Sequence, residues 1–80
     1  MPRYYFHVED LRTYIDEIGV ELPNLPAARN EAVSAAGELL RDGSAETLWT
    51  GKPWQMWVTQ SPAPSEKALL SLYFTATEEK

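Results

Sequence analysis

The side chains near the amino end of the chain fall into two alternating sets between Arg3 and Glu9. One set consists of Tyr4, Phe6 and Val8, and the other of Tyr5 and His7. A period of two places alternate residues on opposite faces of a β-strand. We therefore expect a strand here, with one set in the core and the other on the opposite face.

A second extended run follows from Thr13 to Glu17 and is expected to pair with the first strand as a hairpin. Its alternation is imperfect, because Ile15 is out of phase with Tyr14 and Val20. Gly19 marks a turn or bulge that would absorb this mismatch, since glycine tolerates backbone conformations that other residues avoid.

The hydrophobic period then changes to about 3.6 residues, which indicates a helix from about Leu25 to Arg41. Asn24 suits the N-cap, Pro26 is tolerated in the first turn, and Gly43 ends the helix. The expected apolar stripe is Leu25, Ala28, Ala32, Ala35, Ala36, Leu39 and Leu40. Because the stripe is rich in alanine, it can lie close to a sheet.

The period of two returns in "WQMWVTQ", residues 54–60, and in "ALLSLYFTATEE", residues 68–79. Residues 44–53 read as a loop or an extra turn, and a proline-rich turn spans Ser61 to Ser65. The order is therefore ββαββ, which predicts one α+β domain over residues 1–80. We expect a four-stranded antiparallel sheet with the helix packed on one face.

Composition and charge narrow the classes of function. The 80 residues include no cysteine, so neither disulfides nor thiolate metal ligands are available, and the net charge is -5. The cations are scattered: Arg3, Arg12, Arg29, Arg41, Lys52, Lys67 and Lys80. Nucleic-acid affinity depends on clustered cations, so this pattern disfavours nucleic acid and anionic membranes. With no apolar run near the roughly 20 residues of a membrane span, we expect a soluble, unprocessed cytoplasmic protein.

The start "MPRYYFHV" and the stretch "DEIGVELPNLPAARNEAVSAAGELL" carry a resemblance to a known family. They are similar to M-P-R-Y-F-F-H and D-x-x-G-x-E-L-P-D-L-x-x-A-R-x-E-A in small alphaproteobacterial proteins of unknown function, typical of rhizobia. The first half resembles the family closely and the last strand loosely, whereas Ser44 to Lys67 departs from it. The resemblance implies a bacterial source and no catalytic residues.

The residues themselves argue against an enzyme. His7 is the only imidazole, so a usual two- or three-histidine metal site cannot form within one chain. A Ser-His-acid triad would need His7 beside a serine and a carboxylate, and a lone strand histidine is more typically structural. The pairs Glu9/Asp10 and Asp16/Glu17 could bind a divalent cation weakly, but neighbouring strand residues point to opposite faces. We expect no catalytic residue, no metal and no cofactor.

The aromatic residues suggest a contact surface instead. Tyr4, Phe6, Val8 and the residues in phase with them on the later strands are expected to face the helix. In that case Tyr5, His7, Trp57 and Tyr73 share the opposite face of the sheet. Nothing else in 80 residues is expected to cover that face, and an exposed aromatic patch typically marks an interface. Alternatively, these rings lie scattered, each packed on a neighbour with its polar atom in water.

Two functions from different classes follow. The first is a noncatalytic protein-interaction module that self-associates as a homodimer, or binds another protein, through the aromatic face or an open edge strand. The second is a domain that binds a small ligand or single-stranded nucleic acid, because aromatic rings on a sheet can stack on bases. The ββαββ order is loosely similar to antitoxin halves of bacterial toxin systems, but the acidic charge disfavours this second function.

Overall fold

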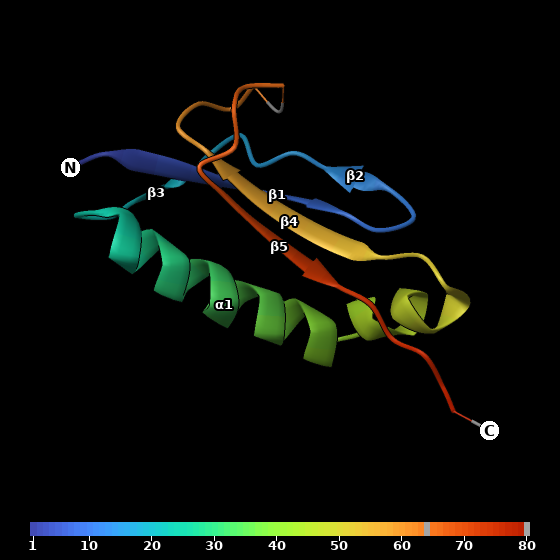
Figure 1. Ribbon diagram of the computed structural model, residues 1–80. Helices are drawn as coiled ribbons and strands as arrows, with labels where there is room; N and C mark the ends of the chain where they lie inside the picture. Colours follow the sequence, from blue (N-terminus) through green and yellow to red (C-terminus); the bar gives the residue numbers. More distant parts are fainter. Residues whose placement is uncertain (64, 80) are drawn as a thin grey trace.

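One helix lies across one face of an antiparallel sheet in the computed structural model, which describes residues 1–63 and 65–79 (Figure 1). This arrangement confirms the α+β class. The elements are β1 (Arg3–Glu9), β2 (Thr13–Tyr14), β3 (Val20–Glu21), α1 (Leu25–Arg41), η1 (Ser44–Thr50), β4 (Trp54–Thr59) and β5 (Leu70–Phe74). Pro64 of the expected proline-rich turn, and Lys80, lie outside the described residues.

The sheet has five strands in place of the four expected. Its order is β2-β1-β4-β5, and β3 also pairs with β1. The expected second strand over Thr13 to Glu17 is divided, because β2 pairs Tyr14 with Val8 whereas β3 pairs Val20 with Tyr4. More residues therefore separate Tyr14 from Val20 than separate Tyr4 from Val8 on β1. We call the intervening residues 15–19 the strap.

The core lies between the sheet and α1 and follows the expected phase of each strand. Its buried members are Tyr4, Val8, Ala28, Ala32, Ala36, Trp54, Met56 and Val58. Trp54 packs edge-on against Phe74, with ring centroids 5.6 Å apart. The central strands β1 and β4 thus supply the buried side chains of the sheet, while the apolar residues of β5 remain half-buried.

Helix α1 begins and ends as its sequence predicts. The Asn24 side chain accepts a 3.0 Å hydrogen bond from the N–H of Ala27, and the helix ends before Gly43, whose φ is 132°. The buried stripe is narrower than expected, because Leu25 and Leu39 are 42% and 40% exposed. Alanines four residues apart form the line of contact with the sheet, so longer side chains on either side of that line reach into solvent.

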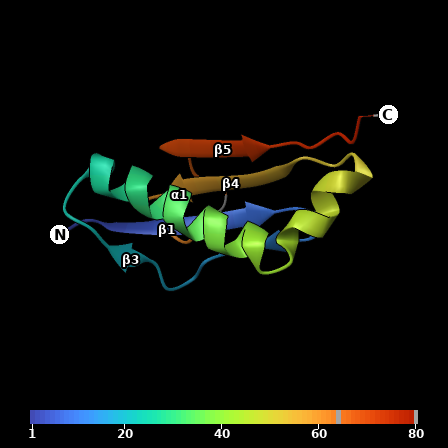
Figure 2. The same cartoon turned by 90° about the horizontal axis from the view of Figure 1, so that it is seen from below.

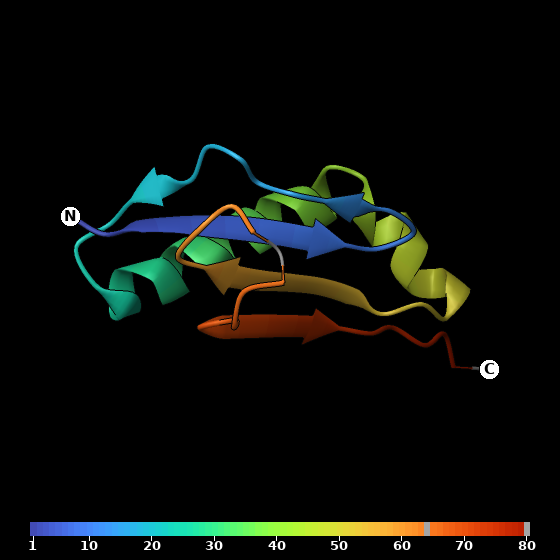
Figure 3. The ribbon, with the colours of Figure 1, turned by 90° about the horizontal axis from the view of Figure 1, so that it is seen from above.

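The face of the sheet opposite α1 is partly covered, which corrects the expectation that nothing covers it. The segment between β4 and β5 crosses this face before returning to the edge (Figure 3). The strap lies beside β1 and contacts the same face through Asp16. As a result His7 and Thr59, which point away from the helix, are both fully buried.

Candidate functional site

The four residues expected to form a contact surface do lie on one face of the sheet. His7 is the direct cross-strand partner of Trp57, and Tyr73 is the partner of Gln55. Cross-strand partners project to the same side of a sheet. We call Tyr5, His7, Trp57 and Tyr73 the aromatic face.

The accessibility of the aromatic face differs sharply from residue to residue. Tyr73 is 65% exposed, Tyr5 and Trp57 are half-buried, and His7 is 0% exposed. The His7 and Trp57 rings are in contact, with centroids 5.3 Å apart and planes tilted by 41°. His7 therefore offers no surface to a partner and instead lies beneath the accessible rings.

His7 is held by hydrogen bonds at both ring nitrogens. Its Nδ1 accepts from the backbone N–H of Asp16 at 3.1 Å, and its Nε2 lies 2.9 Å from Oγ1 of Thr59. The Thr59 hydroxyl donates its own hydrogen to the carbonyl oxygen of Ser61. Oγ1 of Thr59 must therefore accept from Nε2–H of His7, which makes the imidazole the neutral Nε2–H tautomer. His7 thereby connects the strap to the start of the segment that follows β4.

The surroundings of His7 favour this neutral form. Burial lowers the pKa of His7 below its ordinary value of 6.5. The Asp16 carboxylate acts in the opposite direction, because it attracts the protonated ring, but the effect of burial is larger. A proton added at Nδ1 would also point at the N–H of Asp16. Two hydrogen-bond donors would then face each other, and the present hydrogen bond would be lost. Protonation of His7 thus requires the strap to move.

Asp16 explains why the second strand is divided. Its carboxylate accepts the N–H of Phe6 at 3.1 Å through Oδ2, and the N–H groups of Ile18 and Gly19, each at 3.0 Å, through Oδ1. A side chain therefore satisfies a β1 donor that a neighbouring strand would otherwise satisfy. Burial alone would raise the pKa of Asp16, but these hydrogen bonds and the nearby His7 hold it below its ordinary value of 3.8.

Gly19 allows the strap to lie close against β1. Its φ is 75°, and a Cβ atom there would lie 2.8 Å from the side chains of both Arg3 and Tyr5. Arg3 also holds the strap, since its Nη1 donates to the carbonyl oxygen of Ile18 at 2.8 Å. Asp16 and Gly19 were not identified as a unit from the sequence, although Asp followed three residues later by Gly is a turn signal.

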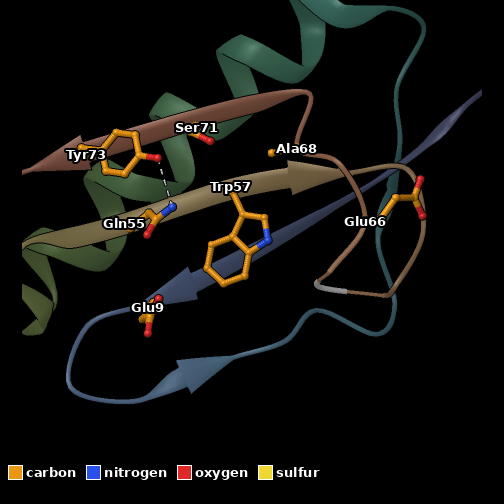
Figure 4. A pocket seen from close by; sticks show the side chains of 7 residues that line it. All are labelled: Glu9, Gln55, Trp57, Glu66, Ala68, Ser71 and Tyr73. Carbon is orange, nitrogen blue, oxygen red and sulfur yellow. Dashed lines mark hydrogen bonds between the residues drawn. The ribbon is translucent and has the colours of Figure 1, made fainter.

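A shallow groove crosses the open part of the aromatic face and measures about 310 Å³ (Figure 4). Its lining residues are Glu9, Gln55, Trp57, Glu66, Ala68, Ser71 and Tyr73. Gln55 donates a 3.3 Å hydrogen bond to the Tyr73 hydroxyl, and Glu66 accepts one from Ser61. Glu9 and Glu66 lie on opposite sides of the Trp57 ring (Figure 4). The groove thus combines an aromatic floor with acidic margins.

The chemistry available at this face is limited by how its groups are used. Both nitrogens of His7 are occupied, and the Asp16 carboxylate already accepts three backbone N–H groups. Across residues 1–63 and 65–79, no three side chains of the His, Cys, Asp and Glu types gather as a metal site would require. Within the same part of the chain, no helix has the length and apolar character needed to cross a bilayer.

Comparison with known proteins places the chain in a family. Among curated proteins and among solved structures, none matches the chain. A family model described as "Domain of unknown function (DUF6894)" matches residues 3–61. The match extends from β1 through β4. It therefore includes much of the segment from Ser44 to Lys67, which was expected to depart from the family. The chain therefore belongs to the DUF6894 family.

Proposed function

We propose that the chain is a noncatalytic protein-interaction module that self-associates through its aromatic face. The observation that carries this proposal is the 65% exposure of Tyr73 beside the half-buried Trp57, on a face that α1 does not cover. Tyrosine and tryptophan provide large contact areas with few rotatable bonds, and they dominate binding energy at protein interfaces. Where an exposed and a half-buried ring of these types lie together on a small domain, they are more typical of a contact surface than of a solvated one.

Within this proposal the members of the aromatic face have different roles. Trp57 and Tyr73 make the contact, and Tyr5 extends it along β1. His7 is a positioning residue, because its ring packs against Trp57 from a fully buried site. The partner thus meets two or three rings whose orientation depends on a polar network beneath them.

The noncatalytic part of the proposal is supported by the hydrogen bonds of His7 and Asp16. A general base needs an accessible lone pair, and Nδ1 of His7 already accepts from the backbone of Asp16. Nε2 of His7 donates to Thr59, a hydroxyl whose own hydrogen is committed to Ser61. Neither ring nitrogen is therefore poised to activate a nucleophile or a water molecule.

Binding of a small polar ligand is a second candidate, favoured by Gln55, Ser71 and Tyr73 in the groove. Single-stranded nucleic acid fits less well, because Glu9 and Glu66 would repel phosphates beside the ring on which a base would stack. The net charge of -5 acts in the same direction. The rings therefore favour protein contact, and the acidic charge disfavours a polyanionic ligand.

Sedimentation equilibrium of matched variants tests the proposal. Truncation of a central aromatic anchor costs about 2 kcal/mol or more, roughly a thirtyfold weakening. We expect Trp57→Ala to raise the dimer dissociation constant by about this factor and Tyr73→Ala to raise it as well, with far-UV circular dichroism nearly unchanged. Tyr14→Ala is the control, because Tyr14 is 53% exposed but pairs with Val8 and so projects toward the other face. Equal weakening by all three variants would contradict the proposal.

A further inference from the structure

Strand β5 (Leu70–Phe74) forms an edge of the sheet. Its inner side pairs with β4 over the whole strand, from Leu70 opposite Val58 to Phe74 opposite Trp54. Its outer side pairs with no strand in the part of the chain that the structure describes. The backbone N–H and C=O groups of an outer side form a template on which another strand can add.

The two edges of the sheet differ in how they resist such addition. At the opposite edge, β2 and β3 are each two residues long and are separated by the strap. Charged groups also lie there, because Nη2 of Arg3 in β1 is 3.7 Å from Oε1 of Glu21 in β3. Short strands, irregular backbone and charge all discourage pairing between sheets. By contrast, strand β5 is continuous, and its sequence "LSLYF" contains no charge and no proline. Pairing is therefore favoured at β5.

The core is also incomplete at β5. Helix α1 runs obliquely over β4 and β1, and β5 lies to one side of it (Figure 2). On β4, Trp54, Met56 and Val58 are at most 1% exposed, whereas their cross-strand partners on β5 are only half-buried. A depression of about 210 Å³ separates α1 from this edge, and its lining residues are Arg29, Val33, Leu70, Ser71 and Leu72. Val33, within it, is 64% exposed.

We infer that a second copy of this chain adds its own β5 antiparallel to this edge, around a twofold axis at Leu72. In that register Leu72 faces its equivalent, and Leu70 of one copy faces Phe74 of the other, so apolar residues meet on the helix side. Such cross-strand pairs stabilise antiparallel sheets. The inference rests on the proposed self-association and names the strand that mediates it.

The lack of charge on β5 makes this edge suitable for a second copy as the occupant. Two chains that each carry a net charge of -5 repel one another, and they approach most easily where each surface lacks charge. Residues 70–74 provide such an uncharged surface, and in the antiparallel register no charge of one strand faces a like charge of the other. A twofold contact between identical uncharged strands is self-complementary.

The pairing also extends the aromatic face. Ser71 and Tyr73 project from β5 to the side opposite the core, because they alternate with Leu70, Leu72 and Phe74. In the paired sheet, Ser71 of one copy would face Tyr73 of the other. The two aromatic faces would then adjoin across the axis, so that Tyr73 contributes to the interface that the proposed function requires.

The absence of cysteine makes this register directly testable by single-cysteine variants. Under mild oxidation we expect Leu72→Cys to form a disulfide-linked dimer, because the axis brings the two introduced side chains together. Val20→Cys, at the opposite edge and 39% exposed, is the control and should remain uncrosslinked. Equal crosslinking of both variants would indicate random collision and would overturn the inference.

A second variant covers the case in which Leu72→Cys disturbs the core. Ser71 is exposed, so a nitroxide label on Ser71→Cys should leave the fold intact and show dipolar broadening of its spectrum. The same label on Thr13→Cys, at the other edge, should not broaden. If sedimentation still detects a dimer but neither β5 variant crosslinks or broadens, pairing through β5 is wrong while self-association stands. A monomeric protein would overturn both proposals.

Discussion

The backbone N–H of Asp16 donates a 3.1 Å hydrogen bond to Nδ1 of His7, and this contact joins the strap to the first strand. The same aspartate accepts the N–H of Phe6 through its carboxylate, so the strap is tied to two consecutive residues of β1. Because one of them projects to each face of the sheet, the strap fixes both the edge of the core and the underside of the aromatic face.

The pH dependence of stability should report the neutral state of His7. The pKa of His7 is lowered on folding, so below its ordinary value of 6.5 the unfolded chain binds a proton that the folded chain does not. This contribution to stability is therefore complete above pH 6.5 and is lost as the pH falls toward the lowered pKa. Urea unfolding at a series of pH values around and below 6.5 measures it.

His7→Gln is the control for this pH series, because it removes the titrating group and retains a polar side chain. We expect this variant to be less stable than the wild type at pH 7.5 and to lose less stability than the wild type on acidification. If the two proteins lost stability in parallel, acidification would be acting through groups other than His7.

Asp16→Asn should destabilise the fold even though the two side chains have nearly the same shape. An amide has one acceptor oxygen where the carboxylate has two. Either the N–H of Phe6, or the N–H groups of Ile18 and Gly19, would therefore face an NH₂ group that cannot accept a hydrogen bond. An unsatisfied donor of this kind costs about 1 to 3 kcal/mol. Asp10→Asn is the matched control, because Oδ1 of Asp10 accepts the N–H of Arg12 and an amide oxygen can replace it. Chemical denaturation should separate the two variants clearly.

Two glycines should respond in opposite ways to alanine. At Gly19 a Cβ would collide with Arg3 and Tyr5 and would require a positive φ, so Gly19→Ala should cost more than about 1 kcal/mol. At Gly37, inside α1, a Cβ meets nothing within 4 Å. Gly37→Ala should therefore stabilise the protein by about 0.5 to 1 kcal/mol through helix propensity. Thermal unfolding followed by circular dichroism gives the sign of both changes.

Catalysis that depends on His7 is not expected. A broad hydrolase screen should detect no activity that His7→Ala abolishes, because both ring nitrogens serve structural hydrogen bonds. Activity that disappeared in this variant, while its circular dichroism spectrum remained native, would contradict the noncatalytic assignment. The spectrum matters here because removal of His7 also removes two buried contacts.

Hydrophobic periodicity is sufficient to predict much of this fold. It predicts β1 over Arg3–Glu9 and α1 over Leu25–Arg41, because each buries one regular face. It also predicts the faces on which Trp57 and Tyr73 lie. Periodicity cannot reveal the division of the second strand, because that feature depends on a carboxylate that replaces a strand as acceptor.

The burial of His7 was missed for a related reason. Alternation shows which face a residue occupies but does not show whether another segment later crosses that face. Here the strap contributes a polar contact from Asp16, and Thr59 at the end of β4 contributes another, and neither contact leaves a hydrophobic signal. The four residues of the aromatic face thus lie on one face of the sheet, as the alternation predicts. His7, however, is enclosed and supports the accessible rings from beneath.

The oligomeric state of the wild-type protein shows whether the chain self-associates at all. Sedimentation equilibrium or light scattering from low to high micromolar concentration, at neutral pH, measures the mass without a label or a substitution. Self-association through the aromatic face predicts a rise from the mass of one chain toward that of two. A mass that stays at one chain throughout this range would contradict self-association, and Trp57 and Tyr73 would then be elements of a monomeric fold.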